Sequence, residues 1–237
     1  LRALRAMLAP GGAAHLMVYA RYGRTGVAMI AEYARMIEVQ ADREDVIDLA
    51  RTLAEIPLGH PISYLLRDTP DFRSVDALAD ALLNPREAAY SVPELLDLLD
   101  AAGWGFRRWY RQAPYRPGCG AVAETPHRDR VAALSAREGF AAMELFRGSI
   151  TTPSLIADDG APSIEDALDA DDWAELVPLR MPGARTITER TPPGAAAVLL
   201  NEQHRYTDLV LPIDEPQRLA VDSIDGQRRI RDITVPD

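Results

Sequence analysis

The first 24 residues place a helix, a tight turn and a strand in immediate succession, and this order restricts the fold more than any other feature. Leu1, Leu4 and Leu8 recur at the spacing of one helical face. The Pro10-Gly11-Gly12 turn ends that helix, because proline cannot continue it and glycine accepts a positive φ. The apolar run from 13 to 19, AAHLMVY, predicts a strand covered on both faces. Together they form half of a parallel α/β unit.

Helical periodicity dominates residues 26–84, and we interpret this part as an insert. Its apolar residues fall on one face of each predicted helix, and charged residues alternate with them, so the other face is expected to meet water. The stretch is too long for a plain connection between strands, which predicts a lid or an insertion over the sheet. The expected helical segments are 27–38, 42–56, 62–66 and 75–83.

A second helix-turn-strand unit follows at residues 91–112. Ser91 and Glu94 have the spacing of a capping box, with Pro93 in the first turn, where its missing N–H costs nothing. Gly103 is expected to end the helix in the left-handed conformation. The aromatic-rich segment WGFRRWYRQ, residues 104–112, then predicts a strand.

Two further elements are expected before the composition changes. One long helix is predicted from about His127 to Phe146, with Gly148 at its end. The short segment 151–157, TTPSLIA, is expected to form a last edge strand. These elements complete a first domain, which we assign to residues 1–157.

Residues 158–237 are expected to form a linker and a small accessory domain. Aspartates and prolines crowd the start of this region, and Ser163 to Asp166 resembles a helix start. Beyond it, the apolar pattern predicts a helix at 195–201, a strand at 208–213 and a helix at 217–223. An α+β arrangement of this size suggests a winged-helix-like domain.

Charge and composition exclude several classes of partner. The net charge of −10 opposes non-specific binding to nucleic acid or to an anionic membrane. No apolar run approaches the length of a membrane span, and no signal-peptide pattern opens the sequence. The single cysteine, Cys119, fits a reducing compartment, so we expect a cytoplasmic protein. His127 and His204 have no partner at metal-ligand spacing, and no metal site is expected.

Two of these segments resemble class I S-adenosylmethionine-dependent methyltransferases. LRALRAMLAPGG before a strand is similar to the helix and Pro-Gly-Gly turn that lead into the fifth strand of that family. SVPELLDLLDAAGWGFRRWY is similar to the following helix and sixth strand. The combination also looks like a bacterial subgroup that carries a helical insert and an extra C-terminal domain.

The resemblance has consequences for fold and chemistry. It implies an α/β fold with the late strands of a Rossmann-like sheet, interrupted by the helical insert. It also implies S-adenosylmethionine as cofactor and an unknown methyl acceptor.

The sequence departs from that family where the cofactor is bound. In the family a glycine-rich loop after the first strand approaches the cofactor, and an acidic residue ends the second strand. No G-x-G-x-x-G run occurs in the sequence, so no cofactor-binding residue is assigned. The sequence also opens inside a helical pattern without a cap, and we therefore expect a fragment of a longer enzyme, inactive on its own.

Candidate substrate-binding residues follow the first predicted strand, because ligands of open α/β sheets lie at the carboxyl ends of strands. Tyr19, Arg21, Tyr22 and Arg24 occupy this position. The alternative is that these tyrosines and arginines cap the edge of the sheet.

Two more candidates come from later loops. His60 and Tyr90 are expected near the substrate, and turn formation is the alternative for these loops. No catalytic residue is assigned.

Three functions are compatible with these features. The first is a methyltransferase part that binds the acceptor, with the reactants mainly positioned for reaction. The second is a non-catalytic module that binds a protein partner, and the third is another nucleotide-binding enzyme, such as a dehydrogenase. Because a fragment lacks the natural neighbour of the strand at 13–19, the edge of this strand is expected to be covered by another chain in an oligomer, or to be prone to pairing and aggregation.

Overall fold

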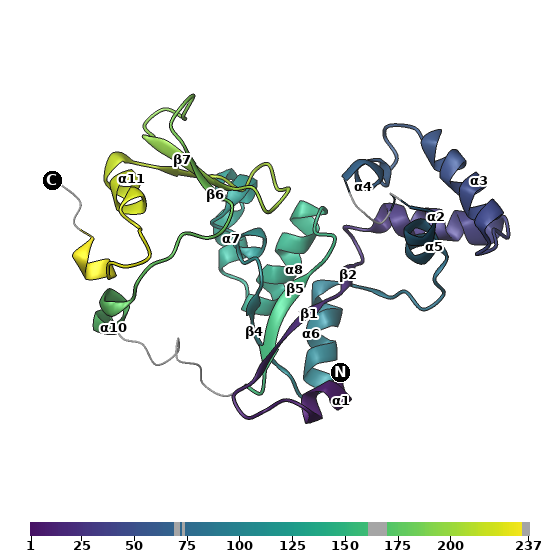
Figure 1. Ribbon diagram of the computed structural model, residues 1–237, viewed down its shortest axis with the longest axis horizontal. Coiled ribbons are helices and arrows are strands. Elements are labelled where there is room, and N and C mark those ends of the chain that lie inside the picture. The colour runs from purple at the N-terminus through teal and green to yellow at the C-terminus, as the bar shows by residue number, and fades with distance from the viewer. Residues whose placement is uncertain (69–71, 73, 161–169, 234–237) are drawn as a thin grey trace.

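We describe the chain from a computed structural model, which covers residues 1–68, 72, 74–160 and 170–233 (Figure 1). The helix start predicted at Ser163–Asp166 lies outside these residues. The described elements form an α/β structure with small sheets, and the strands are β1 (Ala13–Met17), β2 (Tyr19–Ala20), β3 (Ala89–Tyr90), β4 (Gly105–Trp109), β5 (Ser154–Asp158), β6 (Ala184–Ile187), β7 (Ala197–Asn201) and β8 (Leu211–Ile213). The α-helices are α1 (Arg2–Ala6), α2 (Thr25–Met36), α3 (Arg43–Ala54), α4 (Ser63–Asp68), α5 (Val75–Leu83), α6 (Val92–Ala101), α7 (Arg128–Ala132), α8 (Ala136–Arg147), α10 (Ala170–Glu175) and α11 (Glu215–Asp222).

The central sheet has the strand order β1-β5-β4. Both outer strands are antiparallel to β5, so β1 and β4 run in the same direction and end at the same edge of the sheet. The prediction that the segment 151–157 is an edge strand is therefore wrong. Strand β5 is central because both of its backbone edges are paired, while Leu155 and Ala157 are fully buried on one face.

Strand β1 forms where the sequence predicts it, but it is not covered on both faces. Its residues alternate between exposed and half-buried, and within the described chain β1 pairs with β5 alone. One face carries Ala14 and Leu16, which pack against the core, whereas His15 and Met17 point outward. An apolar run of this length does not distinguish a central strand from an edge strand, because burial depends on neighbours that lie far away in the sequence.

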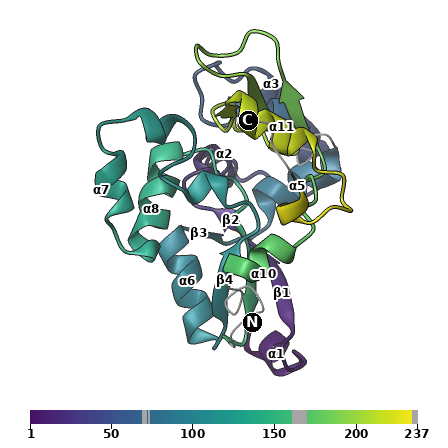
Figure 2. The same ribbon diagram turned by 90° about the vertical axis from the view of Figure 1, so that its left-hand side faces the viewer.

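Helices α6 and α8 cover one face of the central sheet (Figure 2). The capping box of Ser91 and Glu94 at the start of α6 is confirmed, and Gly103 follows this helix with a φ of +75°. The shared core includes Trp104 and Trp109, both nearly fully buried, so the aromatic segment after α6 packs inward as a strand should.

A buried carboxyl group links these two helices. Glu144 on α8 is 1% exposed and accepts a hydrogen bond of 2.8 Å from the Val92 N–H in the first turn of α6. Burial raises the pKa of the Glu144 carboxyl above its ordinary value, although the Val92 N–H bond acts in the opposite direction. The folded protein therefore holds this proton more tightly than the unfolded chain does.

Glu144→Gln is expected to remove a loss of stability at neutral pH. A carboxyl whose pKa is raised in the folded state lowers the free energy of unfolding progressively as pH rises above the pKa of the unfolded chain. Each tenfold decrease in its acid dissociation constant on folding corresponds to about 1.4 kcal/mol. Glutamine does not titrate. The free energy of unfolding of the variant relative to the wild type should therefore be higher at pH 8 than at pH 4, measured by urea denaturation at both values.

Glu138→Gln on the same helix is the matched control. Ser135 lowers the pKa of the exposed Glu138, so this substitution should cost stability at pH 8 and little at pH 4. If Glu144→Gln shows the same sign of pH dependence as Glu138→Gln, burial does not favour the protonated form of Glu144.

Helices α2 to α5 form a separate cluster that follows β2, beyond one end of the central sheet (Figure 1). The helices predicted at 27–38, 42–56 and 75–83 are confirmed, and their apolar faces meet in one core that includes Ile30, Leu49 and Leu78. The predicted position of these helices over the central sheet is not confirmed, because their apolar faces pack against one another inside the cluster.

The prediction of one long helix from His127 to Phe146 is wrong, because the chain breaks into α7 and α8. Ser135 lies between them and caps α8, with Glu138 completing a second capping box. This S-x-x-E pattern is visible in the sequence, and it places a helix start at Ser135 although the apolar periodicity continues through it. Gly148 ends α8 with a φ of +57°, as predicted.

The last part of the chain holds an antiparallel sheet in the order β6-β7-β8, followed by α11. The prediction of a helix at 195–201 is wrong, since β7 occupies these residues as the central strand and pairs on both sides. The helix predicted at 217–223 is confirmed in α11, and β8 confirms part of the strand predicted at 208–213. The winged-helix-like arrangement is not confirmed, and the division of the chain at residue 157 stays a prediction.

Candidate functional site

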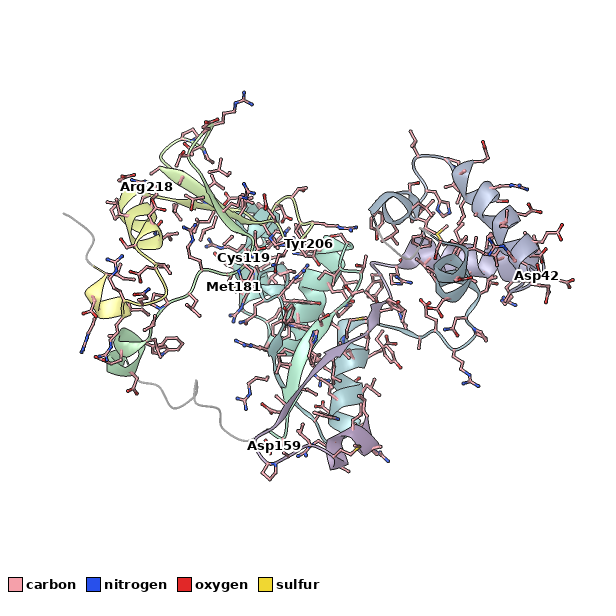
Figure 3. The ribbon with its side chains drawn as sticks, viewed as in Figure 1. Asp42, Cys119, Asp159, Met181, Tyr206 and Arg218 are labelled. Atoms are coloured by element: carbon pink, nitrogen blue, oxygen red, sulfur yellow. The ribbon has the colours of Figure 1, made fainter. Side chains whose placement is uncertain are left out.

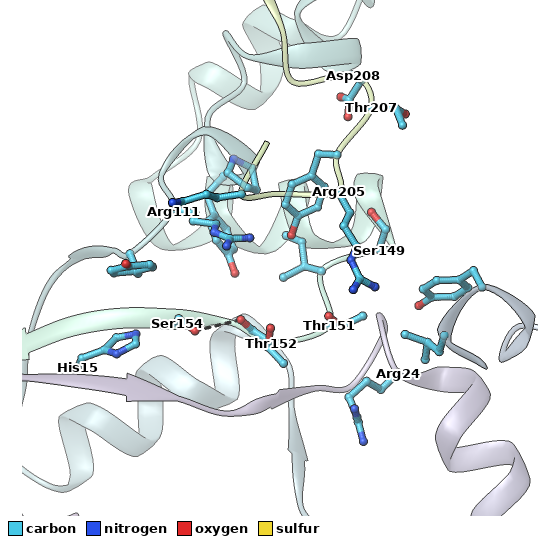
Figure 4. Close-up of a pocket in the computed structure, with 18 residues that line it drawn as sticks. His15, Arg24, Arg111, Ser149, Thr151, Thr152, Ser154, Arg205, Thr207 and Asp208 are labelled. Carbon is cyan, nitrogen blue, oxygen red and sulfur yellow. Dashed lines mark hydrogen bonds between the residues drawn. The ribbon is translucent and has the colours of Figure 1, made fainter. Parts of the chain in front are cut away.

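A cavity of about 720 Å³ opens at the edge of the central sheet where β1 and β4 end (Figure 4). We call it the edge cavity. Ligands of open α/β sheets bind at the carboxyl ends of strands, which makes this position the first candidate for a site. Five parts of the chain meet there: β1 through His15, the helical cluster through Arg24 and Tyr64, and the segments 110–115 after β4, 149–154 at the start of β5 and 203–208 after β7.

Two arginines bring positive charge to the walls of the edge cavity. Arg111 is the second residue after β4, and Arg205 lies in the segment after β7. Figure 4 shows Arg205 extending from that segment toward Thr151. Across the described chain, neither arginine makes a hydrogen bond or an ion pair, and both are exposed to solvent. Their guanidinium groups are thus available to a ligand.

Arg24 has a different role in the same wall. Its side chain is only 3% exposed and its Nη2 lies 3.3 Å from Glu87 Oε1. Its guanidinium carbon lies 3.8 Å from the centre of the Tyr19 ring, a cation–π contact. In Figure 4 the guanidinium of Arg24 points away from Arg205. Arg24 therefore supports the wall, and its charge is directed to the side of Glu87.

A buried arginine fixes the segment that carries Arg205. Arg147, at the end of α8, donates from Nη1 to both carboxylate oxygens of Asp208, at 3.0 and 2.9 Å. Its Nε donates to the carbonyl of Pro114 at 2.8 Å and its Nη2 to the carbonyl of Cys119 at 3.2 Å. Figure 3 labels Cys119 and Tyr206, and both of these residues contact Arg147. We call this set of contacts the Arg147 anchor.

The backbone N–H of Ala121 completes the anchor by donating to Asp208 at 2.8 Å. Burial by itself would raise the pKa of Asp208, but this N–H and the Arg147 guanidinium together hold it below its ordinary value. Asp208 is therefore ionised at neutral pH, and its charge is compensated by Arg147 within the protein.

Tyrosine side chains form much of the remaining surface. Tyr115 stacks on Trp109, with ring centres 3.9 Å apart and an interplanar angle of 11°. Burial raises the pKa values of Tyr115, Tyr206 and Tyr64, so their phenols stay protonated at neutral pH. The Tyr64 hydroxyl donates to the carbonyl of Gly23, and within the described residues the buried Tyr115 hydroxyl has no hydrogen-bond partner.

The structure brings Arg24 to the edge cavity from among the residues predicted at the end of the first strand. Tyr19 lies under Arg24 and lines no part of this cavity. Arg21 pairs with Glu94 at 2.7 Å and faces a second cavity. Tyr22 is 42% exposed and lines neither cavity. Contact of these side chains with a substrate stays a prediction.

His60 and Tyr90 lie away from the edge cavity. His60 accepts a hydrogen bond from the Ile62 N–H through Nδ1, at 3.1 Å, which supports the turn before α4. Tyr90 belongs to the short strand β3, which pairs in parallel with β2, and its carbonyl accepts from the Arg21 N–H. The structure gives both residues local structural roles, and their contact with substrate also stays a prediction.

The second cavity, of about 810 Å³, lies between α2 and the segment 81–89. Several of its charged side chains are paired with neighbours: Arg35 with Glu32, and Arg24 with Glu87. The rest of its lining is largely apolar. Because these charges are already paired, this cavity offers a ligand less uncompensated charge than the edge cavity does.

The described residues do not fit S-adenosylmethionine as a complete binding site. Such a site needs glycines whose backbone a cofactor can approach. A Cβ at Gly23 would lie 1.9 Å from the Ile150 carbonyl oxygen, and one at Gly26 would lie 2.3 Å from the Ile62 nitrogen. These glycines accommodate the protein's own backbone. The acidic residue of the edge cavity, Asp208, is already bound to Arg147.

Neither a metal site nor a membrane span is found in the part of the chain that the structure describes. No group of three or more potential histidine, cysteine or carboxylate ligands comes together there. The described helices all lack the length and apolar character that crossing a bilayer requires.

Comparison with solved structures finds a protein with a similar fold. The structure is similar to that of PKMT2 from Rickettsia typhi, with a TM-score of 0.57 and 10% sequence identity, over 98% of this chain and 46% of that protein. At such low identity the likeness concerns the fold alone: the chain has a fold similar to part of PKMT2.

By sequence, the chain is 25% identical over 160 residues to an uncharacterized protein of Synechococcus sp.. The matched region covers 64% of this chain and 37% of that protein. It thus spans less than half the length of either relative. No family model matches the sequence.

Proposed function

We propose that this chain forms the acceptor-binding side of an S-adenosylmethionine-dependent methyltransferase. The observation that carries the proposal is the position of the edge cavity, at the shared edge where the parallel strands β1 and β4 end. The similarity of the fold to PKMT2 supports the proposal that this cavity serves methyl transfer. The cofactor's glycine-rich loop belongs, in this proposal, to residues outside the chain.

The residues of the chain bind and orient the acceptor. Methyl transfer depends largely on holding the acceptor nucleophile in line with the methyl group, and such positioning supplies much of the rate. Arg111, Arg205 and the hydroxyl groups of the 149–154 segment hold the acceptor against the sheet edge. The Arg147 anchor keeps Arg205 and Tyr206 in place.

The outer edge of β1 supports the proposal that a further strand adjoins it. Within the described chain β1 pairs with β5 alone, so its outer backbone groups can accept another strand. An exposed edge of this kind invites pairing. We propose that this neighbour comes from the part of the enzyme that binds the cofactor, and a second copy of the chain is the alternative.

Calorimetric titration with S-adenosylhomocysteine tests the proposed function. Residues 1–237 alone are expected not to bind it measurably, whereas a longer natural protein that contains this chain should bind. Tight binding by residues 1–237 would show that the cofactor site lies within this chain, contrary to the proposal. Failure of the longer protein to bind, or an upstream sequence without a glycine-rich loop after a strand, would exclude a methyltransferase.

A non-catalytic module that binds a protein partner is the second candidate. It is favoured by an apolar stripe on α2 and the residue that follows it, where large side chains are 42% to 73% exposed: Met29, Tyr33, Met36 and Ile37. A stripe of this kind facing solvent is typical of an interaction surface. The titration above separates the two candidates, because a module of this kind binds no cofactor in either form.

A further inference from the structure

We propose that the acceptor bound in the edge cavity carries an anionic group, a carboxylate or a phosphate, which Arg111 and Arg205 hold. This inference rests on the proposed function for the identity of the ligand as an acceptor. The affinity of the cavity for an anion follows from the charges and contacts of the described residues alone, so it can be tested separately.

The first argument is the charge balance of the cavity. The protein as a whole is acidic, with a net charge of −10, yet Arg111 and Arg205 stand in this cavity without a carboxylate partner among the described residues. Asp208 is the acidic side chain of the described lining, and its charge is compensated by Arg147. An acidic protein that gathers two uncompensated cations at a sheet edge creates a local positive potential, which attracts anions.

The second argument is the supply of neutral hydrogen-bond donors. The hydroxyls of Ser149, Thr151 and Thr152 lie in the segment toward which Arg205 extends (Figure 4). The side chain of Ser154, at the start of β5, also lines the cavity. Guanidinium and hydroxyl donors together suit the several acceptor oxygens of a carboxylate or phosphate.

The third argument is that the cavity disfavours an acceptor with a cationic group. Tyrosine rings can enclose a cationic group such as an alkylammonium, and this cavity has several tyrosines. However, an ammonium group would meet the repulsion of Arg111 and Arg205, and the Tyr206 ring already faces the Arg147 guanidinium at 5.5 Å. The arrangement therefore selects against a cationic acceptor group and in favour of an anionic one.

Titration of the chain with inorganic phosphate, followed by NMR of the arginine Nε–Hε signals, tests the inference. We expect shifts for Arg111 and Arg205, and binding that weakens as ionic strength rises. The double variant Arg111→Gln/Arg205→Gln should weaken binding by about tenfold or more, because it removes two sets of charge-assisted hydrogen-bond donors. Methylammonium at the same concentrations should produce no shift.

Arg130→Gln is the matched control, since Arg130 is also exposed, has no hydrogen bond or ion pair in the described structure and lies on α7 outside the cavity. It should bind phosphate as the wild type does. Circular dichroism of all variants should be unchanged, because these exposed side chains make no hydrogen bonds or ion pairs with other described residues. Equal weakening by Arg130→Gln, or no weakening by the double variant, would overturn the anion site.

Competition in the longer natural protein identifies the source of the anionic group. S-adenosylhomocysteine also carries a carboxylate, and if it displaces phosphate from the edge cavity, the arginines hold the cofactor and the inference about the acceptor is wrong. Simultaneous binding supports the acceptor. Loss of cofactor binding with intact phosphate binding would reject the proposed function and leave the anion site standing.

Discussion

Replacing Arg147 by methionine is expected to lower the free energy of unfolding by about 3 kcal/mol, because it removes one partner of a largely buried ion pair. The Arg147 side chain is 3% exposed and that of Asp208 is 29% exposed. The variant removes the charged partner of the Asp208 carboxylate and leaves it with backbone N–H donors such as that of Ala121. It also removes the Arg147 donors from the carbonyls of Pro114 and Cys119. Urea denaturation measures the loss.

The same substitution should release the wall of the edge cavity. Asp208 ties the segment 203–208 to α8, and Arg205 and Tyr206 lie on this segment. We therefore expect faster amide hydrogen exchange over 203–208 in Arg147→Met, with little change in α8 itself. The double variant Arg147→Met/Asp208→Leu should recover part of the lost stability, because an apolar pair leaves no buried charge.

Arg137→Met on the same helix is the control for charge removal. Arg137 pairs with Asp97 and Asp100, but its side chain is 41% exposed and those of the aspartates are 69% and 66% exposed. Exposed pairs of this kind contribute about 0–1 kcal/mol. If both variants lose the same stability, or if Arg147 and Asp208 show no coupling in a double-mutant cycle, the Arg147 anchor does not hold the wall.

Gly23→Ala is expected to cost about 3 kcal/mol, the upper end for overpacking, because the new methyl group has no room. Its Cβ would lie 1.9 Å from the carbonyl oxygen of Ile150 and 3.0 Å from the Thr151 nitrogen. These are backbone atoms of the segment before β5, which cannot rotate away as a side chain can. Relief therefore requires the loop after β2 and the 149–154 segment to separate, and urea denaturation measures the cost.

That separation should also widen the edge cavity, since Ile150 and Thr151 line it and Tyr64 donates to the Gly23 carbonyl. Gly59→Ala is the control. A Cβ at Gly59 meets nothing within 4 Å, and the reduced freedom of the unfolded chain should make this change neutral or stabilising by about 0.4–1 kcal/mol. A Gly23→Ala variant as stable as Gly59→Ala would show that the two segments are not in contact.

Local sequence signals predicted most helices correctly, because periodicity and caps act over a few residues. Ser91 with Glu94 defined the start of α6, and the apolar face from Val75 to Leu83 gave α5 its full length. The error at α7 and α8 has the same local origin: Ser135 and Glu138 form a second capping box that the continuous apolar pattern obscured. Where two local signals compete, the cap decides the boundary.

Strand roles were harder to predict, because they depend on pairing between distant segments. The run AAAVLLN at 195–201 has the composition of a short helix or a strand, and its partners β6 and β8 make it a strand. In the same way β5 is the central strand because β1, near the start of the chain, and β4 both pair with it. No signal inside the segment 151–157 reveals these two partners.

The candidate site shows the same division. The rule that ligands lie at the ends of parallel strands led from the first strand to Arg24, and the same rule applied after the second predicted strand would have found Arg111. Arg205 and Asp208 had no comparable signal. They reach the cavity from the segment after β7 because Arg147, on α8, binds Asp208.

Most of the helices and the two helix-turn-strand units could be predicted from the sequence, because each is encoded within a short run of consecutive residues. Which strand is central, and which charges remain uncompensated, became clear from the folded chain, because pairing and burial are set by contacts between segments far apart in the sequence. Arg111 and Arg205 belong to two such segments, and the fold brings both to one cavity at the sheet edge.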